Sequence, residues 1–166
     1  MTFKRLVLMP LAALVLAVSA PAKAAEYKID HSHTFIEFKV IHLGFSWLNG
    51  RFDDFDGSFT FDPEAGPEAQ KISLTIDTTS INSNHAERDK HLRSDDFLNV
   101  EKFPEAKFVS TGYSGDASGG TLTGDFTLMG VTKPIEIKVK KIGEGKDPWG
   151  GYRAGFEGTA EFDRRD

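Results

Sequence analysis

The side chains best suited to chemistry in this sequence are its five histidines and the acids near them. His85 and His91 lie six residues apart in a segment that also holds Asp89, Asp95 and Asp96. A histidine beside a carboxylate can act as a general acid or base, so His85, Asp89 and His91 form a candidate catalytic set. The same side chains can instead cap a helix and form ion pairs that fix this segment to the rest of the fold. We favour this structural interpretation.

A metal centre is the other chemistry that histidines suggest. His31 and His33 share one face if their segment is extended, whereas His42 falls on the opposite face. Zinc needs three or four converging ligands, and the spacing of His85 and His91 does not suit one side of a helix. The chain has no cysteine, which excludes thiolate ligands, thiol nucleophiles and disulfides. We therefore expect no catalytic residues, no metal site and no cofactor.

The first 24 residues have the pattern of a secretory signal peptide. Lys4 and Arg5 precede an uncharged apolar run, Leu6–Val18, and a small-residue cleavage site ends at Ala24. The run is shorter than the roughly 20 apolar residues needed to span a bilayer. We predict a mature domain, residues 25–166, that resides in the periplasm of a Gram-negative bacterium or outside the cell, without an integral membrane span.

The charge of the chain limits its partners. The formal net charge is −5, and removal of the signal peptide takes away three basic residues and no acid. Nucleic acid requires a basic patch, and anionic membranes attract basic proteins. We therefore expect no nucleic-acid partner and no electrostatic docking on anionic lipid.

Apolar and polar residues alternate along most of the mature chain, which predicts half-buried β-strands. The clearest runs cover residues 36–40, 54–61, 71–77, 121–128, 135–140 and 153–162, with a weaker run at 106–113. Turn signals separate the runs at Asn49-Gly50, Gly119-Gly120, Met129-Gly130 and Asp147-Pro148. Antiparallel strands with such short links form a sandwich or an up-and-down barrel.

One segment departs from this alternation and predicts a helix over residues 84–93. Asn84 can be the N-cap, and Glu87 follows at the spacing of a capping box. Pro104 ends the excursion from the strand pattern. We expect the whole insertion, about residues 84–98, to lie over the mouth of a barrel as a lid or plug.

The apolar faces of the strands contain glycine between large side chains, as in Phe55-Gly57-Phe59 and Leu122-Gly124-Phe126. Glycine inside a strand gives up packing and suits a bend or a close approach. A small barrel can be filled by side chains or hold one ligand, and the pattern leaves both arrangements open. An outer-membrane barrel fits less well, because Trp and Tyr number only 2 and 3 and the strands are short.

Six separated motifs occur in the mature chain, at Tyr27–His33, Phe38–Ser46, Phe52–Phe59, Asn84–Leu92, Gly130–Pro134 and Asp147–Gly151. Together, and in this order, they closely resemble the YceI family of periplasmic proteins. The resemblance implies a lipocalin-like antiparallel β-barrel with a helical insertion. It also implies a channel that holds a polyisoprenoid chain, such as an isoprenoid quinone, its precursor or a similar lipid. Members act as carriers rather than enzymes and often occur as dimers, so a homodimer is an implied partner.

Members of this family usually continue past the point where this chain stops, at Asp166. We therefore expect the closing strand of the barrel to be missing and the chain to be truncated at its C-terminus. An open edge of this kind can pair with other strands.

Binding in such a channel would depend on desolvation, to which each buried CH₂ contributes roughly 0.8 kcal/mol. We expect apolar strand residues to form the channel wall, namely Phe38, Val40, Phe59, Leu74, Ile76, Phe126, Leu128, Ile137 and Phe156. Phe45, Trp47 and Leu48 precede Asn49-Gly50, where a loop should be polar, so we expect them at the entrance. A lipid-modifying barrel enzyme that uses His85, Asp89 and His91 is the alternative.

Overall fold

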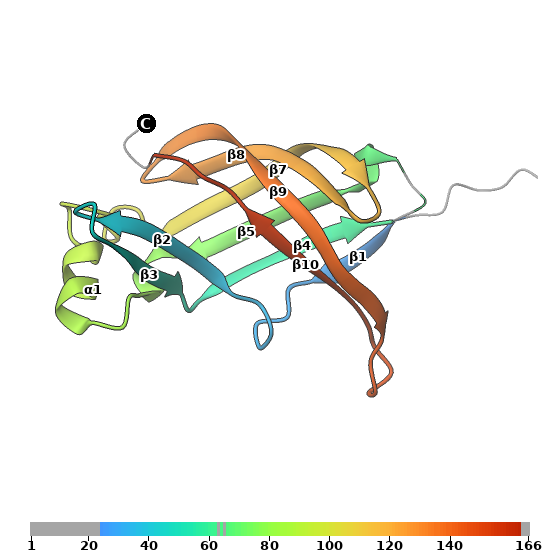
Figure 1. The fold of residues 1–166 in the computed structure, drawn as a ribbon, viewed down its shortest axis with the longest axis horizontal. Helices are drawn as coiled ribbons and strands as arrows, with labels where there is room; N and C mark the ends of the chain where they lie inside the picture. The colour runs from blue at the N-terminus through green and yellow to red at the C-terminus, as the bar shows by residue number, and fades with distance from the viewer. Residues whose placement is uncertain (1–23, 63, 65, 164–166) are drawn as a thin grey trace, which may run out of the picture.

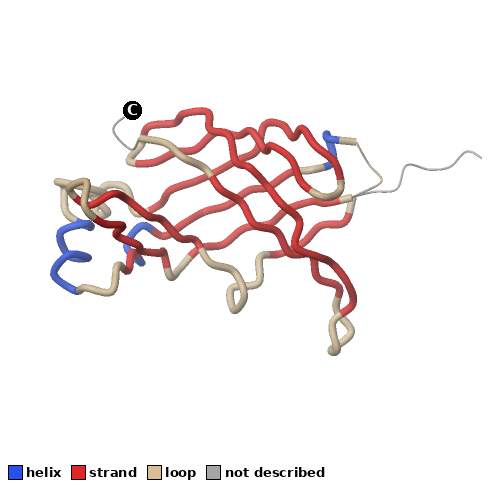
Figure 2. Tube along the Cα trace, in the orientation of Figure 1, coloured by secondary structure: helices blue, strands red, loops and turns tan. Residues whose placement is uncertain are grey.

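The structure is a computed structural model, which describes residues 24–62, 64 and 66–163. The predicted signal peptide therefore lies, except for its last residue, outside the described residues. The described chain is all-β apart from one short α-helix and two 3₁₀ turns, as Figure 2 shows. Its strands form two antiparallel sheets (Figure 1).

The larger sheet has seven strands in the order β1-β4-β5-β7-β8-β9-β10. Their bounds are Ala25–Lys28 (β1), Phe55–Phe61 (β4), Lys71–Asp77 (β5), Glu105–Asp116 (β7), Gly119–Leu128 (β8), Val131–Lys146 (β9) and Tyr152–Thr159 (β10). The smaller sheet has the order β2-β3-β6, with bounds Ile36–His42, Ser46–Phe52 and Ile81–Asn82. The helix α1 covers Ala86–Arg93, and the 3₁₀ turns cover Pro67–Ala69 and Thr78–Ser80. Within the described residues, β10 pairs only with β9 and β2 only with β3.

The larger sheet is curled into a half-barrel. Four strands separate β4 from β10, so a flat sheet would hold them about 24 Å apart. The Phe156 ring nevertheless contacts Phe59 and Phe61 edge-on, with ring centroids 5.7 and 5.0 Å apart. The side of the sheet that carries these rings is therefore the concave face.

Two clusters of buried apolar residues lie at the end of the half-barrel that carries α1. One cluster joins Phe55, Ile76 and Ala106. The second joins Ile81, Leu98 and Val100 beneath the helix. Phe52 and Leu128 pack against both clusters and so connect the two sheets. Figure 1 places α1 and the β2–β3 hairpin at this end, and the β9–β10 hairpin at the other.

Period-two alternation predicted every long strand of the larger sheet, and the structure confirms that each exists. β9 is much longer than predicted, since it covers Val131–Lys146 instead of residues 135–140. The short strands β1 and β6 have four and two residues, too few for a periodic pattern to show. His31 and His33 lie in a turn rather than on one strand face, so that expectation is wrong.

The predicted turn at Asn49-Gly50 is wrong, because both residues lie inside β3. Gly50 pairs with Phe38, and a Cβ on Gly50 would lie within 2.3 Å of the Phe38 ring. This glycine therefore makes room for a ring instead of reversing the chain. The reversal occurs at Leu43 and Gly44, whose φ values of 52° and 78° suit a tight hairpin turn.

The other three predicted turns have different outcomes in the structure. Met129 and Gly130 form the tight connection between β8 and β9, with φ values of 52° and 77°. The pair Gly119-Gly120 begins β8, and the chain turns just before it. The predicted turn at Asp147-Pro148 is confirmed and lies between the end of β9 at Lys146 and the start of β10 at Tyr152.

The helix begins later than predicted. His85, not Asn84, is the N-cap, since its side chain accepts a hydrogen bond from the Arg88 backbone N–H at 3.3 Å. Asn84 instead adopts a left-handed conformation with φ of 62°. The helix ends at Arg93, and the rest of the expected insertion is made of turns.

Candidate functional site

Seven of the predicted wall residues share the concave face of the larger sheet. Directly opposed residues in antiparallel strands point to the same side, and the register aligns Leu74 with Phe108 and Phe108 with Phe126. It likewise aligns Leu122 with Ile137. The seven residues are Phe59, Leu74, Ile76, Phe126, Leu128, Ile137 and Phe156. Ile76 is buried and the other six are partly buried.

The wall residues predicted on the β2–β3 hairpin are divided between its two faces. Phe38 packs against the core cluster beneath α1. Val40 and its partner Leu48 lie on the same face as Phe38, farther toward the hairpin turn, and Val40 is exposed. Trp47 pairs with Ile41 on the opposite face.

The tip of this hairpin is apolar and exposed. Phe45 has 89% of its surface exposed and Trp47 has 57%. The Lys39 ammonium lies 4.6 Å from the centroid of the Trp47 ring. The structure therefore does not bring Phe45 and Trp47 to the concave face, and their expected role at an entrance stays a prediction.

Aromatic rings occupy the concave face at the end away from α1. Tyr27 stacks on Phe59 with a centroid distance of 4.9 Å and an interplanar angle of 5°. Phe156 reaches across from β10 to both Phe59 and Phe61. A ligand chain that lies along this face must pass these rings or displace Phe156.

A lysine also lies on the concave face, and sequence reasoning missed it. Lys141 continues the apolar row Ile135, Ile137 and Val139 with the same period of two, and it pairs directly with Phe156. The sequence does contain a signal for Lys141, namely a charged residue at the end of an apolar row. Its ammonium lies 2.6 Å from the Glu144 carboxylate and 5.1 Å from the Phe61 ring centroid.

The Lys141–Glu144 ion pair is largely shielded from solvent, with side-chain exposures of 16% and 24%. Strand pairing shifts register between Gly155 and Phe156, and such a bulge redirects the neighbouring side chains. Burial raises the pKa of Tyr27, and the nearby Tyr152 and Glu144 raise it further, against a lowering by Lys141. The Lys141–Glu144 pair therefore lies near Tyr27 and Tyr152 among the aromatic rings of the concave face.

An ion-pair network joins the β9–β10 hairpin to the connection between β1 and β2. Arg153 donates to the Asp30 carboxylate and, through Nε, to Asp147 at 2.8 Å. Hydrogen bonds from the side chains of Ser32 and His33 hold the pKa of Asp30 well below its usual range, and Arg153 adds to this effect. The two loops are therefore tied by groups that are charged at neutral pH.

Residues 27–166 match the YceI-like domain family. The chain belongs to this family. A UPF0312 protein from Pseudomonas aeruginosa is 58% identical over 162 residues, which cover 94% of this chain and 84% of that protein. Protein YceI of Escherichia coli O157:H7 is 56% identical over 147 residues, which cover 87% of this chain and 76% of that protein. The crystal structure of a Campylobacter jejuni YCEI protein has a TM-score of 0.63 and 34% identity, and covers 78% of this chain and 76% of that one.

The alternative catalytic set of this YceI family member is not assembled in the structure. The Asp89 carboxylate accepts hydrogen bonds from the Ser83 hydroxyl and, at 2.8 Å, from the Ser83 backbone N–H. His85 caps α1, and His91 Nε2 lies 3.0 Å from the Asp96 carboxylate. Among the described residues the side chains of His85, Asp89 and His91 do not bond one another, which supports their structural interpretation.

The helix is fixed to the smaller sheet by charged side chains. Arg93 donates to the backbone oxygens of Thr79 and Ile81 at 2.7 and 2.8 Å. Burial raises the pKa of Asp89, but the Ser83 hydrogen bonds and the charges of Arg93 and Arg88 outweigh it, so the pKa is lowered. Asp89 is therefore an ionised, hydrogen-bonded anchor at neutral pH.

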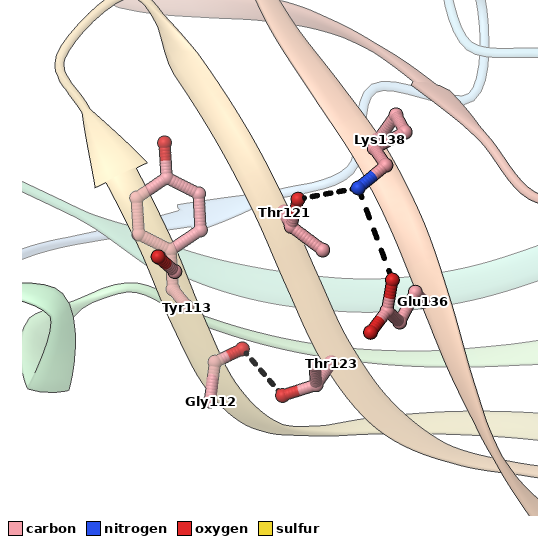
Figure 3. Close-up of a pocket in the computed structure, with 7 residues that line it drawn as sticks. Gly112, Tyr113, Thr121, Thr123, Glu136 and Lys138 are labelled. Atoms are coloured by element: carbon pink, nitrogen blue, oxygen red, sulfur yellow. Dashed lines mark hydrogen bonds and ion pairs between the residues drawn. The ribbon is translucent and has the colours of Figure 1, made fainter.

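A separate polar depression of about 420 Å³ lies on the outer, convex side of the half-barrel (Figure 3). Lys138 lines it and contacts Thr121 at 2.9 Å and Glu136 at 3.8 Å. The part of the chain that the structure describes holds no group of three His, Asp or Glu side chains placed to bind a metal. It also contains no helix of sufficient length and hydropathy to traverse a membrane.

Proposed function

We propose that this YceI family member binds and carries a long-chain polyisoprenoid lipid along the concave face of its larger sheet. The observation that supports this proposal is the gathering of seven apolar wall residues on one curved face. Membership of the YceI family supports a binding role rather than catalysis.

The physical basis of binding is the removal of the prenyl chain from water. Each buried CH₂ contributes roughly 0.8 kcal/mol, so a chain of eight isoprene units gains far more than is needed for tight binding. Part of this gain is offset by the ordering of a flexible chain. We therefore expect high affinity and weak discrimination between tails of similar length.

Loading a prenyl chain requires movement of the Phe156 ring. This ring lies on β10, which pairs with a single neighbour among the described strands. We propose that this ring turns aside when lipid enters, because it crosses the concave face to contact Phe59 and Phe61.

The predicted signal peptide supports a periplasmic location for this carrier. We propose that it works there without a cofactor, an integral membrane span or a nucleic-acid partner. A homodimer stays a prediction from the family resemblance.

Lipid extraction tests the proposed function directly. The full chain is expressed in a Gram-negative host, purified from the periplasm, extracted with organic solvent and analysed by mass spectrometry. We expect one isoprenoid lipid per protein, lost in Ile137→Asn on the concave face. The adjacent Glu136→Asn, on the convex face, is the matched control and should retain the lipid. Absence of isoprenoid from the wild-type protein, confirmed by native mass spectrometry, would reject the proposal.

A further inference from the structure

The stability of the fold does not by itself explain the Lys141–Glu144 ion pair. Desolvation of two charges offsets much of their attraction, so a shielded pair adds little to stability. The same strand carries a second pair, Lys138 and Glu136, on the convex side, with side-chain exposures of 71% and 68%. Only the shielded pair faces the apolar lining of the proposed binding face.

The surroundings of Lys141 suit a polar ligand atom. Its ammonium has three donor hydrogens, and Glu144 takes one of them. Tyr27 stacks on Phe59, which Phe156 contacts edge-on. Tyr152 lies on β10 two residues before Ala154, the strand partner of Glu144. Each tyrosine hydroxyl can donate or accept a hydrogen bond. The ammonium also lies 5.1 Å from the centroid of the Phe61 ring, so it is placed over the aromatic part of the concave face.

We infer that Lys141, Glu144, Tyr27 and Tyr152 form the site for the polar end of the bound isoprenoid, and that this site prefers an uncharged, oxygen-bearing end group to a diphosphate. This inference rests on the proposed function. We call these four residues the polar end site.

The preference follows from charge balance within the polar end site. The charges of Lys141 and Glu144 sum to zero. A diphosphate bound there would therefore be repelled by the carboxylate as well as attracted by the ammonium. The whole chain carries a net charge of −5, which adds to the repulsion. A carbonyl or hydroxyl oxygen can accept from Lys141 or a tyrosine, and a hydroxyl can also donate to Glu144.

Three probes separate the polar end site from binding of the tail. Ubiquinone-9 has an uncharged oxygen-bearing end, solanesyl diphosphate has the same nine-isoprene tail with an anionic end, and squalene has no polar end. Delipidated protein is titrated with each probe and the dissociation constants are measured by fluorescence or native mass spectrometry. We expect ubiquinone-9 to bind roughly tenfold more tightly than solanesyl diphosphate, as one charge-assisted hydrogen bond allows.

A double variant, Lys141→Met with Glu144→Gln, removes both charges together and so leaves neither unpaired. We expect ubiquinone-9 to bind roughly tenfold more weakly, with squalene binding unchanged. The convex pair gives the matched control, Lys138→Met with Glu136→Gln, which should bind all three probes as the wild type does.

Each remaining outcome decides against the polar end site. A wild-type preference for solanesyl diphosphate overturns the inference and leaves the proposed function standing, and this test needs no variant to fold. If the double variant binds squalene and ubiquinone-9 more weakly by the same factor, the Lys141–Glu144 pair has a structural role and does not bind the polar end. Failure of the wild-type protein to bind any probe overturns the inference and the proposed function together.

Discussion

At the α1 end of the half-barrel, buried polar groups are bonded within the protein, whereas at the β9–β10 end a shielded ion pair lies among aromatic rings on an open face. Asp89 is 8% exposed and is held by Ser83. At the other end, Trp149 and Tyr152 are 83% and 52% exposed. The first end resembles the interior of a small domain, and the second resembles a binding surface.

This difference indicates how one sheet can serve two purposes. The α1 end buries two apolar clusters. The β9–β10 end depends instead on ring contacts and a few charges. A carrier needs both, because it must stay folded while one region admits and releases its ligand.

The largest expected effect is the contrast between two isoleucines. Ile81 is 3% exposed at the α1 end and Ile142 is 66% exposed on β9. Ile81→Ala should lower the free energy of unfolding by about 3 kcal/mol, since it leaves a cavity in the core. Ile142→Ala should change it by less than about 0.5 kcal/mol. Denaturant unfolding measures both, and equal losses would remove the distinction between the two ends.

Asp89 gives the next largest effect. Asp89→Asn should lower the free energy of unfolding by about 2 kcal/mol at pH 7, because the Ser83 donors lose an ionised acceptor in a buried site. Denaturant unfolding at pH 7 measures the free energy of unfolding of the wild type and of the variant. The N-cap at His85 is not affected, so α1 should still form and the far-UV spectrum should be retained.

Acidification supplies the control for Asp89. Its pKa is lowered in the folded protein, so the unfolded chain binds the proton first. The stability that Asp89 contributes is present above the unfolded pKa of about 3.9 and is lost as the pH falls through the folded pKa. The difference between wild type and Asp89→Asn should therefore shrink below about pH 4. A difference that stays constant down to pH 2 would contradict this account.

Phe156 tests the β9–β10 end with a smaller effect on stability. Phe156→Ala removes two edge-on ring contacts, each worth about 0.5–1.5 kcal/mol, so we expect a loss of about 1–3 kcal/mol. If Phe156 obstructs the concave face, the variant should also take up ubiquinone-9 from vesicles faster than the wild type. Leu98→Ala, in the buried cluster beneath α1, is the comparison that should lose more stability without faster uptake.

The same comparison explains what could be predicted from the sequence. Alternating residues predicted the strands and the apolar face, because burial of one side of a sheet imposes a period of two. Turns were harder, since Gly50 serves the Phe38 ring and Leu43 takes the left-handed position that glycine usually occupies. Contacts between distant strands, such as Phe59 with Phe156, depend on curvature that no local pattern encodes. Lys141 could be recognised only as the charged end of an apolar row.

The smallest expected effect concerns the Arg153 network, which ties the β9–β10 hairpin to the β1–β2 connection. The Arg153 side chain is about half exposed, although its partner Asp147 is only 10% exposed, so Arg153→Met should lower the global Tm only slightly. It should nevertheless raise amide hydrogen exchange in β10, because the hairpin loses its links to Asp30 and Asp147. Lys107→Met breaks an exposed ion pair on the central strand β7 and is the matched control, for which β10 exchange should not change.

The pKa shifts add a second test of the Arg153 network. Asp30 and Asp147 both have lowered pKa values, so both stay ionised until the pH falls below the ordinary carboxylate range near 4. Wild-type protein should therefore exchange slowly in β10 at pH 5 and lose this protection, after correction for intrinsic exchange, well below pH 4. The Arg153→Met variant should show no such step. If acid changes β10 exchange equally in both proteins, the Arg153 ion pairs do not hold the hairpin. The ring contacts of Phe156 then hold it, and the charges have no structural role at this end.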